Sequence, residues 1–251
     1  DREDLGKPMI AVVNSFTEMV PGHFHLRELA DFVKQGIIEA GGIPREFSTI
    51  AICDGLCQGH CGMRYPLPSR DLIADSIEMV VQAHHFDAMV LIPGCDKIIP
   101  GMLMAAARLD IPAIVVTGGP MLPGNVGGNP LFCSSELREF PGRVEQGSCT
   151  VEEMKKAEEA ALPTVGSCAH LGTANSMCML TEVLGMSLPG CGTAPAVSNR
   201  RKRIAKQSGR QVMELLRQNI RPRDIMTQSA FHNAETIDMA LGCSTNTMLH
   251  L

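Results

Sequence analysis

Three reactive side chains stand in consecutive positions of the segment IPGCDKIIPG: the thiol of Cys95, the carboxyl of Asp96 and the amine of Lys97. The segment follows an apolar run, 88–92, and leads into residues with helical spacing. A thiol at a helix N-terminus feels the positive end of the helix dipole, so we expect a lowered pKa for Cys95 and a thiolate that binds soft metals. Asp96 is either a hard oxygen ligand for Mg²⁺ or the N-cap of the helix. Lys97 is either an ion-pair partner or a desolvated amine with a lowered pKa, able to react as a nucleophile.

A second group of ligand-type residues occupies the segment CDGLCQGHCGM, which follows another predicted strand. Asp54 offers a second hard oxygen donor suited to Mg²⁺. Cys53, Cys57 and Cys61 recur at every fourth position, and this spacing suits either metal ligation or three small core residues. They form no C-x-x-C pair, so a tetrahedral zinc finger is poorly supported.

Two further loops contain residues that could bind an anion or a metal. In TGGPM, Gly118 and Gly119 allow backbone N–H groups to approach an anion closely, for example a substrate carboxylate. In PTVGSCAHLGTANSM, Cys168 lies ahead of a predicted helix, in the same electrostatic setting as Cys95. Taken alone, each of these two cysteines can also be an inert buried residue.

The elements that must position these residues alternate between strand and helix in the first half of the chain. The predicted strands are 8–15, 46–53, 88–92 and 111–117, and the predicted helices are 25–42, 69–86 and 97–110. This order predicts an α/β fold with a mostly parallel sheet and helices on both faces. Ligands of such sheets bind at the carboxyl ends of the strands, so we expect the loops described above to meet there.

The second half predicts a mainly helical extension of the same domain. Residues 121–130, MLPGNVGGNP, are typical of a loop, and helices are predicted at 150–162, 173–187, 200–219 and 230–242. We therefore expect one α/β domain over 1–251, with its core sheet at about 8–120 and its helical extension at about 150–251. The chain begins without Met and ends in an apolar pattern, so we expect it to be part of a longer protein.

Composition narrows the class of protein. The 251 residues carry 22 basic and 27 acidic side chains, a net charge of −5, and 4% aromatic residues, so a nucleic-acid partner is not expected. No apolar run approaches the ~20 residues that span a bilayer, and no signal peptide is recognisable, which favours the cytoplasm. In that reducing compartment the ten cysteines are expected to be thiols or metal ligands. No G-x-G-x-x-G follows a predicted strand, so a dinucleotide-binding enzyme is not indicated.

Four separated motifs together resemble the dihydroxy-acid dehydratase/phosphogluconate dehydratase family, in the family's order and through nearly all of the chain. The motifs are VVNSFTEMVPGHFHLRELA, GCDKIIPGMLMAAARL, GSCAHLGTANSMCMLTEVLGMSLPG and GCSTNTMLHL. The match is closest to the dihydroxy-acid dehydratase branch. The branch that acts on sugar acids, including 6-phosphogluconate, is the alternative. A degenerate, non-catalytic module is the second alternative, because some ligand positions of the family are changed.

The resemblance implies a hydro-lyase of branched-chain amino-acid biosynthesis that dehydrates a 2,3-dihydroxy carboxylate to a 2-keto acid. It implies an iron–sulfur cluster, 2Fe–2S or 4Fe–4S, as Lewis acid, with Cys95 and Cys168 as ligands. It also implies Mg²⁺ held by Asp54, Asp96 and a carbamylated Lys97. A homodimer or larger homo-oligomer is expected. Family members continue into a β-barrel-like domain with a further acidic Mg²⁺ ligand and a catalytic Ser, both outside 1–251, so we expect this chain alone to be inactive.

The chain departs from the family pattern at three places. Many members have a third cluster ligand, a Cys, at the position of Gly22. Cys61 stands where relatives have an acidic residue, and we consider it a hypothetical replacement ligand. Around Val165 the chain reads LPTVGSC where many relatives read C-P-x-C-G-S-C, so only Cys168 remains. The third cluster ligand and the cluster type are therefore open at this stage.

Overall fold

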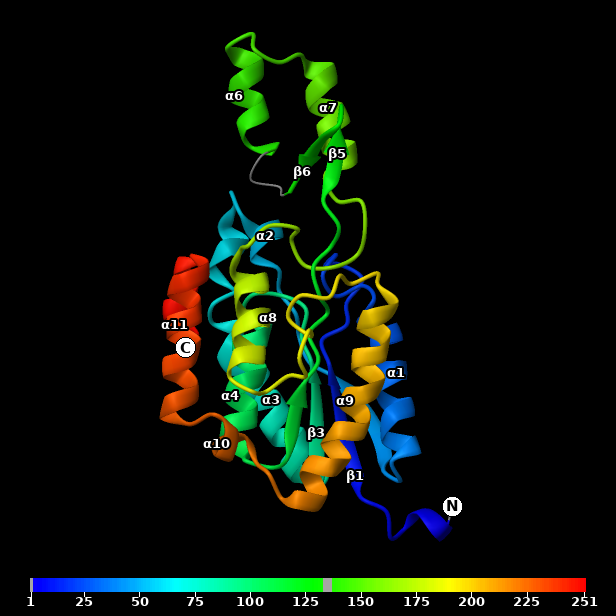
Figure 1. Cartoon of the computed structure of the whole chain (residues 1–251). Coiled ribbons are helices and arrows are strands. Elements are labelled where there is room, and N and C mark those ends of the chain that lie inside the picture. Colours follow the sequence, from blue (N-terminus) through cyan, green and yellow to red (C-terminus); the bar gives the residue numbers. More distant parts are fainter. Residues whose placement is uncertain (1, 133–136) are drawn as a thin grey trace.

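The computed structural model describes residues 2–132 and 137–251, and its centre is a four-stranded parallel sheet (Figure 1). The strand order is β2-β1-β3-β4. The strands are β1 (Met9–Asn14), β2 (Ile43–Ser48), β3 (Ala88–Ile92) and β4 (Ala113–Val115). Every neighbouring pair in this sheet is parallel, which confirms the predicted α/β class.

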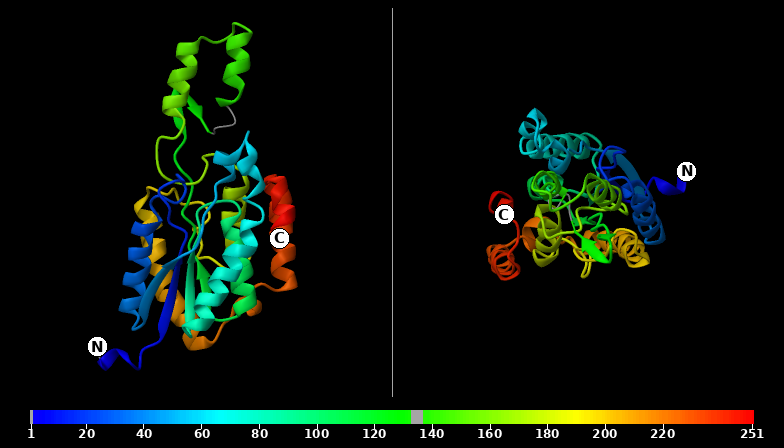
Figure 2. Two further views of the ribbon diagram at one scale, coloured as in Figure 1. Left: turned by 180° about the vertical axis from the view of Figure 1, so that it is seen from behind. Right: turned by 90° about the horizontal axis from the view of Figure 1, so that it is seen from above.

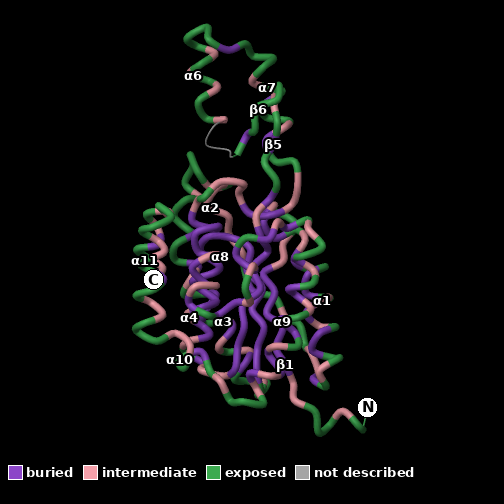
Figure 3. The backbone as a smooth tube through the Cα atoms, viewed as in Figure 1, coloured by how far each residue is buried: buried purple, intermediate pink, exposed green. Residues whose placement is uncertain are grey.

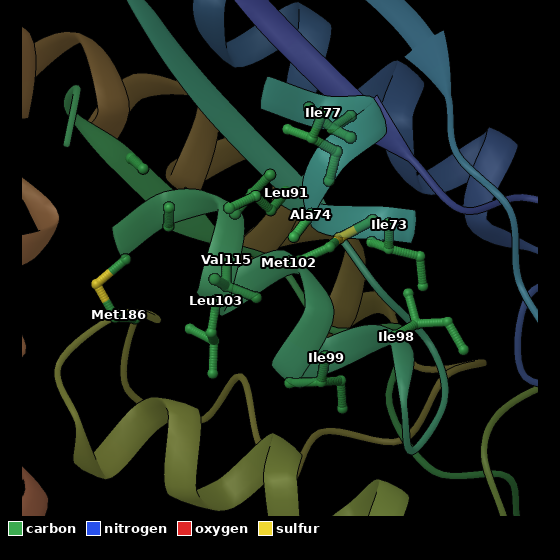
Figure 4. Close-up of a cluster of buried hydrophobic side chains, with 14 of the residues drawn as sticks. Ile73, Ala74, Ile77, Leu91, Ile98, Ile99, Met102, Leu103, Val115 and Met186 are labelled. Carbon is green, nitrogen blue, oxygen red and sulfur yellow. The ribbon is translucent and has the colours of Figure 1, made fainter. Parts of the chain in front are cut away.

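Alternate residues of β1, β3 and β4 enter two separate cores, one on each face of the sheet. Ile10, Val90 and Ile114 belong to one buried cluster, whereas Ala11, Leu91 and Val115, the residues that follow them in the chain, belong to the other. Figure 4 shows the second cluster, in which Leu91 and Val115 of the sheet meet Ile73, Ile77, Ile98 and Met102 of two helices. Since both faces are covered, these strands are apolar except at Asn14, the last residue of β1, as expected for a buried parallel sheet.

Helices from both halves of the chain form the two covering layers. The helices α1 (Leu26–Glu39) and α9 (Asn199–Gln218) pack on one face. On the other face lie α3 (Ser69–Ala83), α4 (Ile98–Leu109) and α8 (Thr173–Val183), with α11 (Gln228–Leu241) outside them (Figure 2). The shorter helices are η1 (Arg2–Asp4), α2 (Asp54–Cys57), η2 (Cys61–Arg64), α10 (Pro222–Ile225) and η3 (Thr245–Leu249). Helices on both faces are thus confirmed. None of the helices in the described ranges combines the length and apolar character needed to cross a membrane.

An arm projects from the body beyond the carboxyl edge of the sheet (Figure 1). It contains β5 (Gly124–Val126), β6 (Asn129–Leu131), α6 (Glu139–Glu145) and α7 (Val151–Ala160). The prediction of a loop at 121–130 is wrong, because β5 and β6 form an antiparallel hairpin. Its two-residue turn is Gly127-Gly128, with φ of 60° and 89°, the left-handed backbone that such turns require. Most of the arm is exposed or half-buried, in contrast to the body (Figure 3).

The second strand lies three to five residues earlier than predicted, and this shift determines where the ligand loop begins. Gly41, with a φ of 90°, follows the end of α1, and the chain pairs with β1 from Ile43 onwards. Pairing ends at Ser48, opposite Asn14, where β1 itself ends. The predicted strand 46–53 therefore had the wrong bounds, and Cys53 lies in a loop beyond the sheet.

The crossing of α1 and α9 depends on two glycines. A Cβ on Gly36 would lie 2.0 Å from the carbonyl oxygen of Lys206, and one on Gly209 would lie 2.2 Å from that of Val33. We expect Gly36→Ala to lower the free energy of unfolding by about 3 kcal/mol, because the helices must separate to admit the methyl group. Gly142→Ala is the matched control, since nothing lies within 4 Å of a Cβ there. Urea unfolding of both variants tests this, and equal stabilities would contradict it.

Candidate metal centre

The loops after β2 and β3 bring their sulfur and charged side chains into contact at the carboxyl edge of the sheet. The Sγ atoms of Cys53 and Cys95 and a carboxylate oxygen of Asp54 all lie within 4.8 Å of one another. Lys97 Nζ lies 2.6 Å from Asp96 Oδ1 and 3.9 Å from Asp54 Oδ2. The structure therefore places the predicted residues of these two loops in one cluster.

The thiols of this cluster also face a small cavity of about 100 Å³. Cys53, Cys95 and Cys168 all line it, together with backbone of the loop that carries Gly22. Leu56 and Leu162, each about half exposed, lie on the cavity's border with solvent. Three thiols from three separate segments thus share one largely apolar cavity, which is a suitable environment for a soft, thiolate-bound metal group.

Cys95 is positioned by a close approach between two backbone segments. A Cβ on Gly94 would lie only 2.2 Å from the carbonyl oxygen of Gly22, so only glycine fits at position 94. The carbonyl of Cys95 accepts a hydrogen bond from Ile99 N in the first turn of α4, at 3.2 Å. The thiol therefore lies just before α4, as predicted from the sequence.

Cys168 is positioned by a strand-like extension of β4. Ser167 forms a parallel bridge with Pro120, because its N–H donates to Gly119 O at 2.9 Å and its carbonyl accepts from Met121 N at 2.8 Å. The next residue, Cys168, is thereby fixed beyond the sheet edge, 73 positions after Cys95 in the chain.

Asn175, in the first turn of α8, completes this support, although no pattern in the sequence indicated a role for it. Its Nδ2 donates to the carbonyl oxygens of Cys168 and His170, and its Oδ1 accepts from Ser167 Oγ at 2.7 Å. Three hydrogen bonds from one buried amide restrict the loop, so Asn175 is a positioning residue for Cys168.

The two carboxyl groups affect each other strongly. Burial and the neighbouring Asp96 raise the pKa of Asp54 to about 7. Burial opposes ionisation of Asp96, but contacts with His250, Asp54 and Lys97 outweigh it and hold the pKa of Asp96 below its usual range. Asp96 also does not cap a helix, since α4 has its N-cap at Lys97 and no side-chain hydrogen bond there. The N-cap interpretation of Asp96 is therefore wrong.

His250 is a second residue that sequence reasoning missed, although it lies in the quoted motif GCSTNTMLHL. Arg70 Nη1 donates to its Nδ1 at 3.0 Å, so the ring proton of the neutral imidazole is on Nε2. That nitrogen lies 3.8 Å from Asp96 Oδ1, and both side chains are buried. The end of the described chain thus reaches the cluster and presents a polar N–H to one of its carboxylates.

The donor set fits two kinds of metal. Asp96 Oδ1 is buried and has no hydrogen-bond partner in the described part of the chain. Its contact with Lys97 Nζ, at 2.6 Å, is an ion pair that lacks hydrogen-bond geometry. A second carboxylate, Asp54, lies beside it, and hard oxygens of this kind suit Mg²⁺. The thiols of Cys53, Cys95 and Cys168 suit iron. Soft and hard donors therefore lie side by side, as the residue types led us to expect.

The predicted lowering of the Cys95 pKa is wrong. The adjacent Cys53 and complete burial raise the pKa of the Cys95 thiol well above its usual value. The same contact lowers the pKa of Cys53 to about 6. When two thiols are in contact, ionisation of one disfavours ionisation of the other, and here the contact favours the thiolate of the more accessible Cys53 over that of Cys95. The helix-dipole argument for a single cysteine did not include this interaction.

Three other predicted residues are not brought to the cavity. Cys61 is exposed at the start of η2 and is not among the residues that line the cavity. Gly118 donates its N–H to the Pro93 carbonyl at 2.8 Å. Gly119, with a φ of 85°, packs against Arg201, whose guanidinium would collide with a Cβ. The roles of Cys61 in cluster binding and of these glycines in anion binding stay predictions without support from this geometry.

His23 follows Gly22 in the chain, and its buried side chain makes the free energy of unfolding depend on pH. Burial lowers the pKa of His23 to about 4 from the ordinary value of 6.5, and its ring pairs with Ser15 O at 2.6 Å. Between pH 6.5 and 4 the unfolded chain binds a proton at His23 that the folded chain excludes. We therefore expect the neutral, buried His23 to contribute about 3 kcal/mol to the free energy of unfolding. This contribution is fully present above pH 6.5 and is lost as the pH falls towards 4. His23→Asn keeps a donor for Ser15 and should flatten this dependence. An unchanged slope of unfolding free energy against pH in the variant would contradict the assignment.

Comparison with known proteins identifies a family and several relatives of this chain. The chain matches the family described as dihydroxy-acid/6-phosphogluconate dehydratase N-terminal over residues 7–251. A protein named dihydroxy-acid dehydratase from Desulfitobacterium hafniense is 59% identical over 251 residues, which are all of this chain and 44% of that protein. One of the same name from Halothermothrix orenii is 58% identical over 251 residues, which are all of this chain and 45% of that protein. One from Pyrococcus abyssi is 57% identical over 249 residues, 99% of this chain and 45% of that protein. The chain thus spans about half the length of the curated relatives that it matches. With a family match over residues 7–251 and relatives at this level of identity, the chain belongs to the dihydroxy-acid/6-phosphogluconate dehydratase N-terminal family.

Proposed function

We propose that this chain provides the metal-binding half of a hydro-lyase that converts a 2,3-dihydroxy carboxylate to a 2-keto acid. In this reaction the C3 hydroxyl and the C2 proton leave as water, and the resulting enol tautomerises to the keto acid. The observation that carries the proposal is the cluster of thiols and carboxylates at one edge of the sheet. The activity is also the one that the names of the relatives state.

The thiols and the carboxylates receive different roles in this proposal. Cys95 and Cys168 hold the iron–sulfur cluster, which when bound supplies a Lewis acid for the departing hydroxyl. Asp54 and Asp96 hold Mg²⁺, the ion proposed to bind the carboxylate end of the substrate. Residues 95 and 96 are adjacent in the chain, so one tight turn fixes the spacing between the two centres.

Lys97 must lose its positive charge for Mg²⁺ to bind beside it. As an ammonium, it lies against both carboxylates and repels a divalent cation. We assign it a carbamate: the neutral amine attacks CO₂, a C–N bond forms and one proton is released. The side chain then carries an anionic oxygen donor instead of a cation. Its burial, with 6% of the side chain exposed, keeps water away from the carbamate.

The cost of burying these groups favours a functional site over a degenerate module. Asp96, Lys97 and His250 are all nearly inaccessible to solvent. Buried ionic groups are expensive and are often replaceable by apolar residues at no loss of stability. A module used only for association gains nothing from them, whereas a metal site requires them.

A small substrate is favoured over a phosphorylated sugar acid. None of the described residues that line the cavity is basic. The sequence between Thr117 and Glu136 also contains no basic residue that would bind a phosphate. We therefore place the reaction in branched-chain amino-acid biosynthesis. The base for the C2 proton and a further acidic Mg²⁺ ligand are proposed to come from a second domain of the full-length protein.

The test is a substrate panel with the full-length protein, purified without oxygen and supplied with iron, sulfide and Mg²⁺. We expect 2-keto acid to form from 2,3-dihydroxyisovalerate at least about 100-fold faster than from gluconate or 6-phosphogluconate, a difference of about 3 kcal/mol in transition-state binding. Preference for either sugar acid would transfer the proposal to that branch of the family. A folded, colourless protein without iron and without turnover would establish the non-catalytic module.

A further inference from the structure

Three cysteines of the loop after β2 recur at every fourth position, and the structure separates them. Cys53 is half-buried, lines the cavity with Cys95 and Cys168, and has its Sγ within 4.8 Å of that of Cys95. Cys57 is the last residue of α2 and is not among the lining residues. Cys61 begins η2 and is exposed. Of these three cysteines, only Cys53 therefore lines the cavity that Cys95 and Cys168 also line.

Gly22 lines the same cavity as the three thiols but has no side chain that could act as a ligand. A Cβ at position 22 would lie 3.2 Å from Gly94 O and 3.5 Å from Gly166 O, tighter than side chains normally pack at the first of these contacts. These two backbone segments lead directly into Cys95 and Cys168. Glycine at position 22 lets them approach each other, but it contributes no sulfur to the cavity.

We propose that Cys53 is the third protein ligand of the iron–sulfur cluster, in the place that Gly22 leaves without a thiol, and that neither Cys57 nor Cys61 takes part. This inference rests on the proposed function, because it assumes that a cluster is bound. It changes the hypothetical ligand from Cys61, which the sequence offered, to a residue eight positions earlier.

With this assignment, two segments of the site contain the same pair of donor residues. Cys53-Asp54 and Cys95-Asp96 are both Cys-Asp dipeptides, and each follows a strand that pairs with β1. Each dipeptide supplies one soft donor for iron and one hard donor for Mg²⁺. The backbone of Cys53 is extended, with φ of −89° and ψ of 115°, and α2 begins at Asp54. The local fold therefore holds the two donors of this dipeptide in fixed relative positions.

The experiment compares full-length wild-type protein with Cys53→Ser and Cys57→Ser after identical anaerobic reconstitution. Iron and sulfide per chain and the low-temperature EPR spectrum of the reduced protein are the readouts. We expect Cys57→Ser to match the wild type, and Cys53→Ser to lose at least half of its iron or to show a shifted EPR signal. Iron content and EPR spectrum of Cys53→Ser equal to those of the wild type would overturn the inference while leaving the proposed function intact. A wild type that binds no iron would overturn both.

A second measurement on wild-type protein avoids any effect of substitution on folding. Iodoacetamide alkylation is quantified by peptide mass spectrometry before and after a chelator removes the iron. We expect Cys53 to be protected at least about 10-fold in the iron-loaded protein and to react after chelation, whereas Cys57 reacts in both states, since a metal-bound thiolate is a poor nucleophile. Equal alkylation of Cys53 in both states, with iron present in the first, would overturn the assignment.

Discussion

Cys95→Ser in the full-length protein is expected to remove most of the bound iron and to lower dehydration turnover by about 10³-fold or more, the equivalent of about 4 kcal/mol. Cys95 lines the cavity, and its Sγ lies within 4.8 Å of a carboxylate oxygen of Asp54. In the proposed function, its loss removes a ligand of the iron–sulfur cluster, and the departing hydroxyl would then lack its Lewis acid. Iron content and initial rates of 2-keto acid formation are the measurements.

The control for this prediction is Cys57→Ser, because Cys57 lies on the same segment as Cys53 but not on the cavity. It should keep the iron content and rate of the wild type. Because hydroxyl is a weaker iron ligand than thiolate, a Cys95→Ser protein with wild-type iron and rate would show that Cys95 is not a ligand. Circular dichroism of both variants establishes that each is folded.

Lys97→Arg is expected to lower turnover by a similar factor, about 10³-fold, while iron content stays at the wild-type level. The guanidinium keeps a positive charge between Asp54 and Asp96, and it stays protonated at any pH that the protein tolerates. It therefore cannot form a carbamate, and Mg²⁺ should bind poorly. Isothermal titration with Mg²⁺ and the rate of 2-keto acid formation measure the two effects.

Carbon NMR with isotope-labelled bicarbonate tests the chemistry of Lys97 directly. A carbamate signal is expected in the wild type and not in Lys97→Arg. The matched control is Lys7→Arg, at an exposed ion pair with Asp4 at 2.7 Å, which should change neither the signal nor the rate. Full activity of Lys97→Arg would eliminate the carbamate from the proposal without affecting the roles of the cysteines.

Local patterns were sufficient for most of the body. The apolar run at Ala88–Ile92 is buried at every position, and the helices that begin near Leu26 and Ile98 have helical apolar spacing. Such periodicity is set by contact with a core, so it can be read without knowledge of the partner. The hairpin at 124–131 was missed because its strands have only three residues each, too few to show alternation.

Within the site, the sequence by itself determined which chemistry was available. A thiol, a carboxylate and an amine at positions 95–97, with further donors at Asp54 and Cys168, specified soft and hard metal ligands before any geometry was known. The order of strands and helices placed these loops at the carboxyl ends of strands, where parallel sheets bind ligands.

Only the tertiary structure decided which donors meet. The segment that carries Cys53, Cys57 and Cys61 is not one continuous helix, because it consists of the two short helices α2 and η2 with a turn between them. The regular spacing of the three cysteines therefore could not show that Cys53 lines the cavity and that Cys61 is exposed. The pKa of Cys95 depends on Cys53, and the environment of Asp96 depends on His250, 154 positions away. Interactions between loops depend on how strands and helices pack, and no short stretch of sequence contains that information.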